Sequence, residues 1–114
     1  MKLTVFALAV TLLPLSFASS FSAELSVEVL HGKGFFFIAN KDNFEWRDCD
    51  FDLNDDYSFK AASVKAYAIL QIPSGEFTKR NGERFDPARS KALRLGIYCR
   101  GTPTGPMAAL VSWR

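Results

Sequence analysis

The sequence of 114 residues is poor in the residues that metal and nucleophile chemistry most often uses, with two cysteines and one histidine. A Cys/His metal cage with four protein ligands cannot be assembled from that set alone. An excess of charge of one sign is also missing, because 14 Lys and Arg are balanced by 12 Asp and Glu. Proteins that bind nucleic acid by neutralising phosphates carry a clear basic excess. We therefore expect no metal, no cofactor and no nucleic-acid partner.

Familiar catalytic motifs are absent from the sequence as well. It contains no Gly-x-Ser-x-Gly, no His-Glu-x-x-His and no phosphate-binding glycine loop. Its single histidine, His31, lies in a glycine-rich stretch without a serine or cysteine close by in the sequence. Two carboxylates brought together by folding could still act as acid and base. We expect a protein that is not an enzyme, with such a carboxylate pair as the one catalytic route left open.

No apolar run is long enough to be a membrane-spanning helix, which needs about 20 residues. The apolar stretch at 3–15 is shorter and contains Pro14. Lys2 precedes it, and small residues follow it: Ser16, Ala18, Ser19, Ser20, Ser22 and Ala23. This order is typical of a secretory signal peptide. We predict a cleaved signal peptide at 1–23, with the cut after Ala18, Ser20 or Ser22 left open, and one mature domain at 24–114 that does not insert into a membrane.

Export would place the mature chain outside the cytoplasm, secreted or periplasmic, in an oxidising compartment. Cys49 and Cys99 can then form only one disulfide, which would stabilise the fold by roughly 4 kcal/mol in the chain-entropy model. The alternative is a redox pair, but redox cysteines are usually close in sequence, as in Cys-x-x-Cys. We therefore predict a structural disulfide. No cysteine precedes Cys49, which excludes a lipid-modified N-terminal cysteine.

Runs of strand length separated by turn residues fill the mature chain. Apolar and polar residues alternate at 25–29 and 93–100, with the period of two that is typical of half-buried strands. A single helical turn is expected near 86–91. Further strands are expected at 35–39, 44–53, 57–59, 64–72 and 107–113, and Asn81-Gly82 is a tight-turn signal between Phe77 and Phe85. Seven or eight short strands predict an all-β fold, an antiparallel two-sheet sandwich.

The disulfide also predicts a strand register. If 44–53 and 93–100 are antiparallel neighbours with Cys49 opposite Cys99, their apolar residues lie on one face. The expected pairs on that face are Phe51–Ile97 and Leu53–Leu95, and those on the other face are Asp48–Arg100, Asp50–Tyr98 and Asn54–Arg94. Trp46 is out of phase with Cys49, so we expect a β-bulge between them.

Four stretches resemble the turns and core aromatics of a known group: 40–46 (NKDNFEW), 53–57 (LNDDY), 77–87 (FTKRNGERFDP) and 95–99 (LGIYC). They are similar to small exported bacterial sandwich proteins of the immunoglobulin/fibronectin type III-like kind, a group of unassigned activity. The resemblance covers most of the mature chain and implies the sandwich fold. Its motifs are structural, so it carries no catalytic residue to this chain.

An acidic run at 48–56 invites a calcium interpretation. An EF-hand loop needs Gly at its sixth position and Glu at its twelfth, and counting from Asp48 these positions hold Leu53 and Phe59. The motif fails. A spacing of two between aspartates is what the polar face of a strand produces, and we interpret the run in that way.

Charge is segregated along the chain. Residues 42–56 hold seven acids and one base, whereas 79–100 hold seven bases and two acids. The second segment could form a basic patch for an anionic polymer, or the two segments could pair across adjacent strands. We favour pairing, which would leave Arg80, Arg84 and Arg89 as a residual basic patch.

Aromatic residues could supply a sugar-stacking platform, because a ring offers apolar area and Tyr or Trp adds a polar edge. The candidates are Trp46, Trp113, Tyr57, Tyr67 and Tyr98. Most of them are expected in the core of so small a domain. Tyr98 is the best exposed candidate, because its neighbours in the strand should face inward.

The sequence thus predicts an exported, non-enzymatic β-sandwich that binds an unknown protein or polysaccharide outside the cytoplasm. We favour a protein of the envelope or medium, bound by a sheet face or by the loops at Asn81-Gly82 and 101–106. A carbohydrate-binding module that uses Tyr98 is one alternative. An inhibitor that places a loop in the active site of a secreted hydrolase is another.

Overall fold

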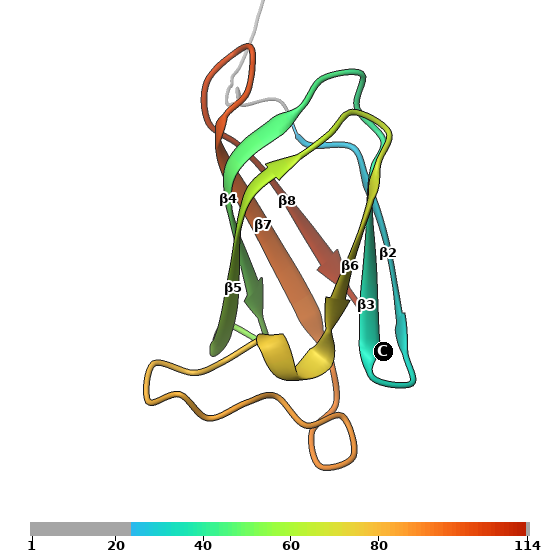
Figure 1. Ribbon diagram of the computed structural model, residues 1–114, viewed down its shortest axis with the longest axis vertical. Helices are drawn as coiled ribbons and strands as arrows, with labels where there is room; N and C mark the ends of the chain where they lie inside the picture. The colour runs from blue at the N-terminus through green and yellow to red at the C-terminus, as the bar shows by residue number, and fades with distance from the viewer. Residues whose placement is uncertain (1–23, 114) are drawn as a thin grey trace, which may run out of the picture.

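The computed structural model describes residues 24–113, so the predicted signal peptide lies outside the described residues. Seven strands form two antiparallel sheets that face each other (Figure 1). The three-stranded sheet has the order β2-β3-β6, with β2 at Val27–Gly32, β3 at Phe35–Asn40 and β6 at Ile69–Pro73. The four-stranded sheet has the order β5-β4-β7-β8, with β4 at Trp46–Leu53, β5 at Tyr57–Val64, β7 at Arg94–Gly101 and β8 at Met107–Ser112. The predicted all-β fold, an antiparallel two-sheet sandwich with seven or eight short strands, is confirmed.

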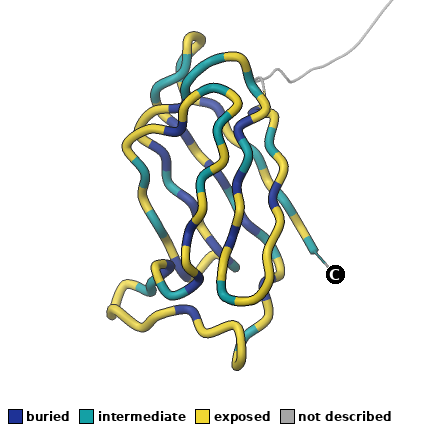
Figure 2. The backbone as a smooth tube through the Cα atoms, turned by 45° about the vertical axis from the view of Figure 1, so that its right-hand side comes forward, coloured by how far each residue is buried: buried dark blue, intermediate teal, exposed yellow. Residues whose placement is uncertain are grey.

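The core lies between the two sheets, where buried and exposed residues alternate along the strands (Figure 2). Its largest fully buried side chains are Trp46, Phe36, Phe51 and Phe77. A 3-10 helix at Ser74–Glu76 leads from β6 into a long connection to β7. Within residues 24–113 no helix is long and apolar enough to cross a membrane.

The predicted pairing of β4 with β7 is confirmed. Cys49 is opposite Cys99 and the two are joined by a disulfide, while Phe51 faces Ile97 and Leu53 faces Leu95. These side chains are buried on the inner face. The disulfide therefore joins neighbouring strands of one sheet, not the two sheets.

The prediction of a β-bulge between Trp46 and Cys49 is wrong. Arg47 is opposite Gly101 and Cys49 is opposite Cys99, so the register is unchanged and no extra residue is inserted. Asp48 has a positive φ of 52° and no partner in either ladder. The left-handed backbone at this one residue turns Trp46 to the same buried face as Cys49.

Two strand boundaries also differ from expectation. The strand expected at 57–59 continues to Val64, and the strand expected at 64–72 begins only at Ile69. Between them, Tyr67 adopts a φ of 61° and Ala68 N–H donates to the Lys65 carbonyl. This turn contains no Gly, Pro, Asn or Asp, so the usual turn signals were absent from the sequence.

The outer edges of the four-stranded sheet are partly covered. Leu25 N–H donates to the Ala108 carbonyl of β8 at 2.9 Å. On the opposite edge, Ser58 of β5 and Thr78 exchange two backbone hydrogen bonds of 2.8 and 3.1 Å. The connection between β6 and β7 thus adds a short fifth chain segment to this sheet.

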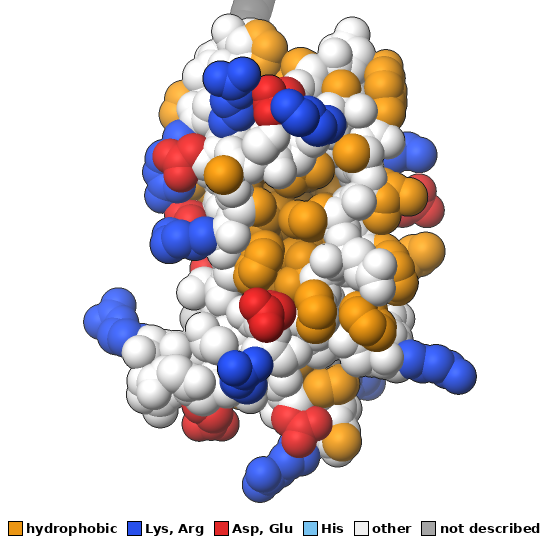
Figure 3. All heavy atoms as spheres, viewed as in Figure 1, with side chains coloured by type: hydrophobic (Ala, Val, Ile, Leu, Met, Phe, Trp, Pro, Cys, Tyr) orange, Lys and Arg blue, Asp and Glu red, His pale blue; other side chains and the backbone are white. Residues whose placement is uncertain are grey.

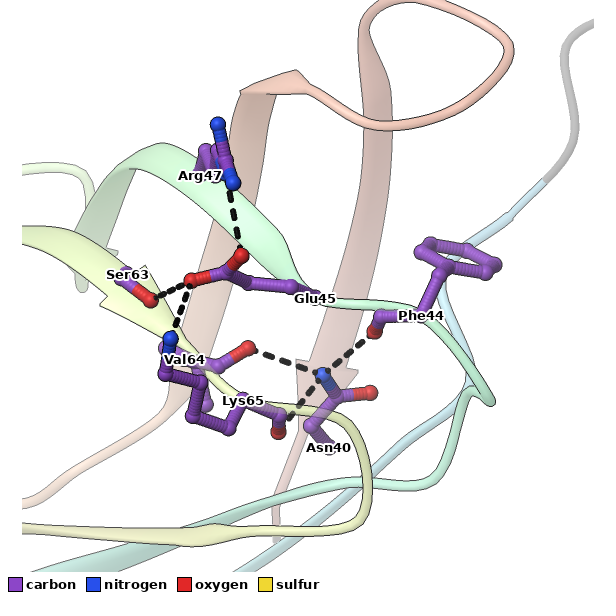
Figure 4. A network of polar contacts seen from close by, with 7 residues as sticks. All are labelled: Asn40, Phe44, Glu45, Arg47, Ser63, Val64 and Lys65. Atoms are coloured by element: carbon purple, nitrogen blue, oxygen red, sulfur yellow. Dashed lines mark hydrogen bonds and ion pairs between the residues drawn. The ribbon is translucent and has the colours of Figure 1, made fainter.

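Asn40 links the two sheets at the upper end of the sandwich (Figure 4). This fully buried residue ends β3, and its Nδ2 lies 3.0–3.1 Å from the carbonyl oxygens of Phe44, Val64 and Lys65. Its Oδ1 accepts a 2.8 Å hydrogen bond from Asp42 N–H. One amide thus satisfies backbone groups that follow β3, in the three-stranded sheet, and backbone groups at the end of β5, in the four-stranded sheet.

Gly101 on β7 lies too close to Arg47 on β4 to accommodate a side chain. A Cβ at this position would lie 2.8 Å from the Arg47 Cβ, closer than packed carbon atoms tolerate, whereas a Cβ at Gly96 would meet only ordinary contact at 3.9 Å. Gly101→Ala should therefore lower the free energy of unfolding by about 1–3 kcal/mol. Gly96→Ala is the matched control, because it introduces the same residue in the same strand. Urea unfolding of both variants measures the difference, and equal stability would show that β4 moves aside freely.

Asn40→Ala should lower the free energy of unfolding by about 3 kcal/mol, because it leaves buried carbonyl groups without a donor. Asn43→Ala, at an exposed position of the same turn, should change it by less than about 0.5 kcal/mol. Thermal and urea unfolding of both variants provide the measurement. A loss for Asn40→Ala no larger than that of the control would mean that water replaces the amide.

Candidate binding surface

Many of the charged side chains on the four-stranded sheet form ion pairs. Arg100 on β7 lies 2.7 Å from Asp50 and 3.6 Å from Asp48, both on β4, and Arg94 lies 2.5 Å from Asp55. The expected pairing of the acidic with the basic segment across adjacent strands is confirmed. Exposed pairs contribute only about 0–1 kcal/mol each to stability, so their main effect is to neutralise this sheet.

Basic side chains without an ion pair gather at one end of the sandwich. Residues 24–113 contain twelve Lys and Arg, and seven of them pair with a carboxylate. The other five come from the turn between β2 and β3 and from the connection between β6 and β7, both at the lower end in Figure 1. We call this group the basic end: Lys33, Arg80, Arg84, Arg89 and Lys91. Figure 3 shows Lys and Arg side chains projecting around this end.

The connection between β6 and β7 is anchored by Phe77 and Phe85. Both rings are buried, and Phe85 N–H donates to the Phe77 carbonyl at 2.8 Å. Asn81 and Gly82 form the tip between them, where Gly82 has a φ of 91° and Asn81 Oδ1 accepts a hydrogen bond from Glu83 N–H. The tight turn predicted there is confirmed, and it is exposed.

The three arginines predicted as a residual patch do not share one site. Arg84 and Arg89 line an open cavity of about 690 Å³, together with Glu83 and Asp86. Arg80 lies beside the tip and does not line that cavity. Two carboxylates beside two guanidinium groups reduce the local positive potential, which weakens this cavity as a site for an anionic polymer.

A smaller cavity of about 250 Å³ lies between the β2–β3 turn and residues 85–92. Lys33 lines it from the β2–β3 turn, Lys91 from the connection between β6 and β7, and Ser74 from the 3-10 helix. The sequence does not predict this cavity, because its lining comes from three segments that are distant along the chain. Only the positions of two lysines without acidic neighbours hinted at it.

The outer side of the three-stranded sheet is apolar. Leu30 is opposite Phe37, Phe35 is opposite Pro73, and Ala39 is opposite Ile69. The large exposed side chains among them are Leu30, Phe35, Phe37 and Ile69. We call this surface the apolar face. Hydrophobic side chains are visible along this sheet and between β5 and β6 in Figure 3.

The apolar face was missed because 35–39 is a continuous apolar run. Such a run predicts a strand but does not say which side is covered. Side chains alternate along β3, so Phe36 and Ile38 enter the core while Phe35 and Phe37 point outward. Antiparallel sheets with one solvated face usually carry polar residues there, so the outward Phe35 and Phe37 were the available signal.

Tyr98 lies on the outer side of the other sheet and is 41% exposed. Its ring is contacted by the Arg100 guanidinium, whose carbon lies 5.1 Å from the ring centre. The prediction that Tyr98 is the best exposed candidate is wrong, because Tyr67 in the turn after β5 is 69% exposed. Of the remaining candidates, Trp46 and Tyr57 are buried, and Trp113 packs against His31. Within residues 24–113, Tyr98 stacks on no other aromatic ring, so the five candidates do not form one aromatic platform.

The acidic run at 48–56 lies on β4 and the turn after it. Hydrogen bonds from Lys60 and Arg100 lower the pKa of Asp50, whereas partial burial and the neighbouring Asp50 charge raise the pKa of Asp52. Neither carboxylate lines the two cavities at the basic end. In the described part of the chain, no group of three or more His, Cys, Asp and Glu is placed to hold a metal ion.

Comparisons with protein-family models, with curated proteins and with solved structures found no significant match for this chain. Two surfaces stand out in the geometry of the sandwich, the apolar face and the basic end, and they meet at Lys33. A hollow lined by Leu30, Phe37 and Lys33 joins them.

Glu45 is the centre of a group of paired charges at the upper end of the sandwich. The Glu45 carboxylate accepts hydrogen bonds from the Ser63 hydroxyl, from Arg47 at 3.0 Å and from Lys65 (Figure 4). These donors lower the pKa of Glu45 to about 2, from an ordinary value of 4.5. A carboxylate with a lowered folded-state pKa stabilises the fold above its unfolded pKa and loses that effect as pH falls towards the folded pKa.

Glu45→Gln should therefore make stability less dependent on pH between about 4.5 and 2. Urea midpoints measured at several pH values across this window test the prediction. Glu76→Gln is the control, because Glu76 forms no ion pair with another residue of 24–113. Parallel pH profiles for wild type and Glu45→Gln would contradict the prediction.

Proposed function

We propose that this chain is an exported, non-enzymatic binding module that recognises another protein of the cell envelope or the medium through its apolar face. The observation that carries the proposal is the exposure of Leu30, Phe35, Phe37 and Ile69 on one sheet surface. Together they expose on the order of 400 Å², a size at which apolar patches on single proteins are often interaction sites. The N-terminal pattern at 1–23 and the Cys49–Cys99 disulfide support export.

The apolar face suits a protein better than a polysaccharide. Aliphatic Leu30 and Ile69 flank the phenylalanine rings of β3, and Gln71 is the uncharged polar residue among them. Sugars need hydrogen-bond partners beside an aromatic ring, whereas the core of a protein interface is apolar with a polar rim. Glu28 and Lys41 form an ion pair at one border of this sheet, and Lys33 lies at the other. The surface therefore has the layout of an interface core with a charged rim.

The binding mechanism is burial of apolar area by shape contact. Removing a leucine side chain from such an interface costs about 1.5–3 kcal/mol, which corresponds to a loss of affinity of about tenfold or more. No covalent or catalytic step is involved. The strands β2 and β6 are the two opposite edges of this sheet, and each pairs on one side only within the described chain. A partner strand could therefore also add to an edge.

A pair of leucines gives a matched test of the apolar face. Leu30 on β2 and Leu110 on β8 are both 63% exposed and lie on the outer faces of different sheets. Leu30→Ser should reduce capture of the partner about tenfold, whereas Leu110→Ser should leave it unchanged. The measurement is light cross-linking of the tagged protein in envelope and culture-fluid extract, followed by mass spectrometry of what co-purifies.

The comparison between the two variants decides the outcome. A protein retained by wild type and Leu110→Ser but lost by Leu30→Ser supports the proposal. A protein retained equally by all three does not use the apolar face. Retention on an insoluble polysaccharide that Tyr98→Ala abolishes would favour the carbohydrate-binding alternative instead.

A further inference from the structure

The smaller cavity at the basic end has a lining that selects for negative charge. Lys33 comes from the turn between β2 and β3, and Lys91 comes from the end of the connection to β7. Neither lysine forms an ion pair with another described residue. No carboxylate lines the cavity, in contrast to the larger cavity beside it. Two lysines without a counter-charge on the lining of one partly open cavity favour an anion there.

Ser74 provides a second, independent observation. The residue is only 4% exposed, and it lines this cavity. Its backbone is already satisfied, because its N–H donates to the Gly34 carbonyl at 2.8 Å and its carbonyl accepts from Phe77 N–H. Its hydroxyl makes no hydrogen bond to any residue of the described chain. A buried hydroxyl normally has a partner, and a bound oxygen atom would supply one.

The remaining lining fits a small group on an apolar stem. Phe36 and Phe85 contribute ring surface, and His31 and Ser90 contribute further polar groups. His31 is held in place by stacking on Phe36, with ring centres 5.6 Å apart, and by edge contact with Trp113 at 4.4 Å. The volume of about 250 Å³ accommodates a carboxylate or phosphate with a few attached carbon atoms.

We infer that the cavity lined by Lys33, Lys91 and Ser74 is a binding site for an oxyanion group, a carboxylate or phosphate carried by a small molecule or by an acidic side chain of a protein. Lys33 and Lys91 would donate charge-assisted hydrogen bonds to it, and Ser74 would donate its hydroxyl hydrogen. The site lies beside the apolar face but does not depend on it. Anion binding at this site can be tested separately from the proposed protein-binding function.

The test is a titration of the purified ¹⁵N-labelled protein followed by NMR. The probes are sodium phosphate, sodium acetate and a short blocked peptide with one glutamate, with sodium chloride at matched ionic strength as the reference. Saturable shifts confined to residues 31–34, 74 and 90–92 are expected for at least one probe. Tighter binding of free phosphate would identify a small-molecule source, and tighter binding of the peptide would identify a protein source.

Variants separate a built site from general attraction to positive charge. Lys33→Gln and Lys91→Gln should each weaken binding about tenfold, and Ser74→Ala several-fold with no change in charge. Arg80→Gln is the matched control, because Arg80 belongs to the basic end but does not line this cavity. It should change affinity less than about twofold.

Two results would overturn the inference. One is shifts with all three probes that never saturate and match those of chloride. The other is a loss for Arg80→Gln as large as the loss for the lysine variants, because the attraction would then be diffuse. Capture of a partner by the apolar face, or its failure, leaves both results unaffected, because the titration requires no partner.

Discussion

The pairing of β4 with β7 is the contact on which the rest of the sandwich depends. Cys49 and Cys99 fix one point of the register, and the period of two then decides which face of each strand enters the core. A shift by one residue would bury Asp50 and expose Phe51. Because the same register brings Arg100 to Asp50, the outer face of this sheet is neutralised as a consequence of how its inner face is packed.

The two ends of the sandwich differ in how their charged side chains are paired. At the upper end, Asn40 joins turns from both sheets and Glu45 gathers three donors, so backbone and charge are satisfied within the chain. At the lower end, the Asn54 side chain plays a similar part, because it donates to the Lys91 carbonyl and accepts from the N–H groups of Leu93 and Arg94. The difference is that five basic side chains at this end form no ion pair within residues 24–113.

The sequence was sufficient for the fold class, the disulfide and the β4–β7 register, because each rests on local alternation or on a single possible pairing. It was insufficient at Tyr67, where a residue without a turn signature adopts a positive φ, and at Asp48, where a predicted bulge is instead a single left-handed residue. The candidate surfaces were harder still. The exposed side of β3 requires knowing which face the other sheet covers, and the cavity at Lys33 and Lys91 requires the path of the connection between β6 and β7.

The covered edges of the four-stranded sheet have a consequence for self-association. Thr78 pairs beside β5 and Leu25 pairs beside β8, so part of each edge of that sheet is already occupied. The three-stranded sheet has β2 and β6 as edges, on either side of its apolar face. Unprotected edges next to apolar surface are where sheets of separate molecules join. At high concentration, aggregation of folded molecules would therefore grow outward from the three-stranded sheet, while the disulfide-bonded sheet keeps its structure.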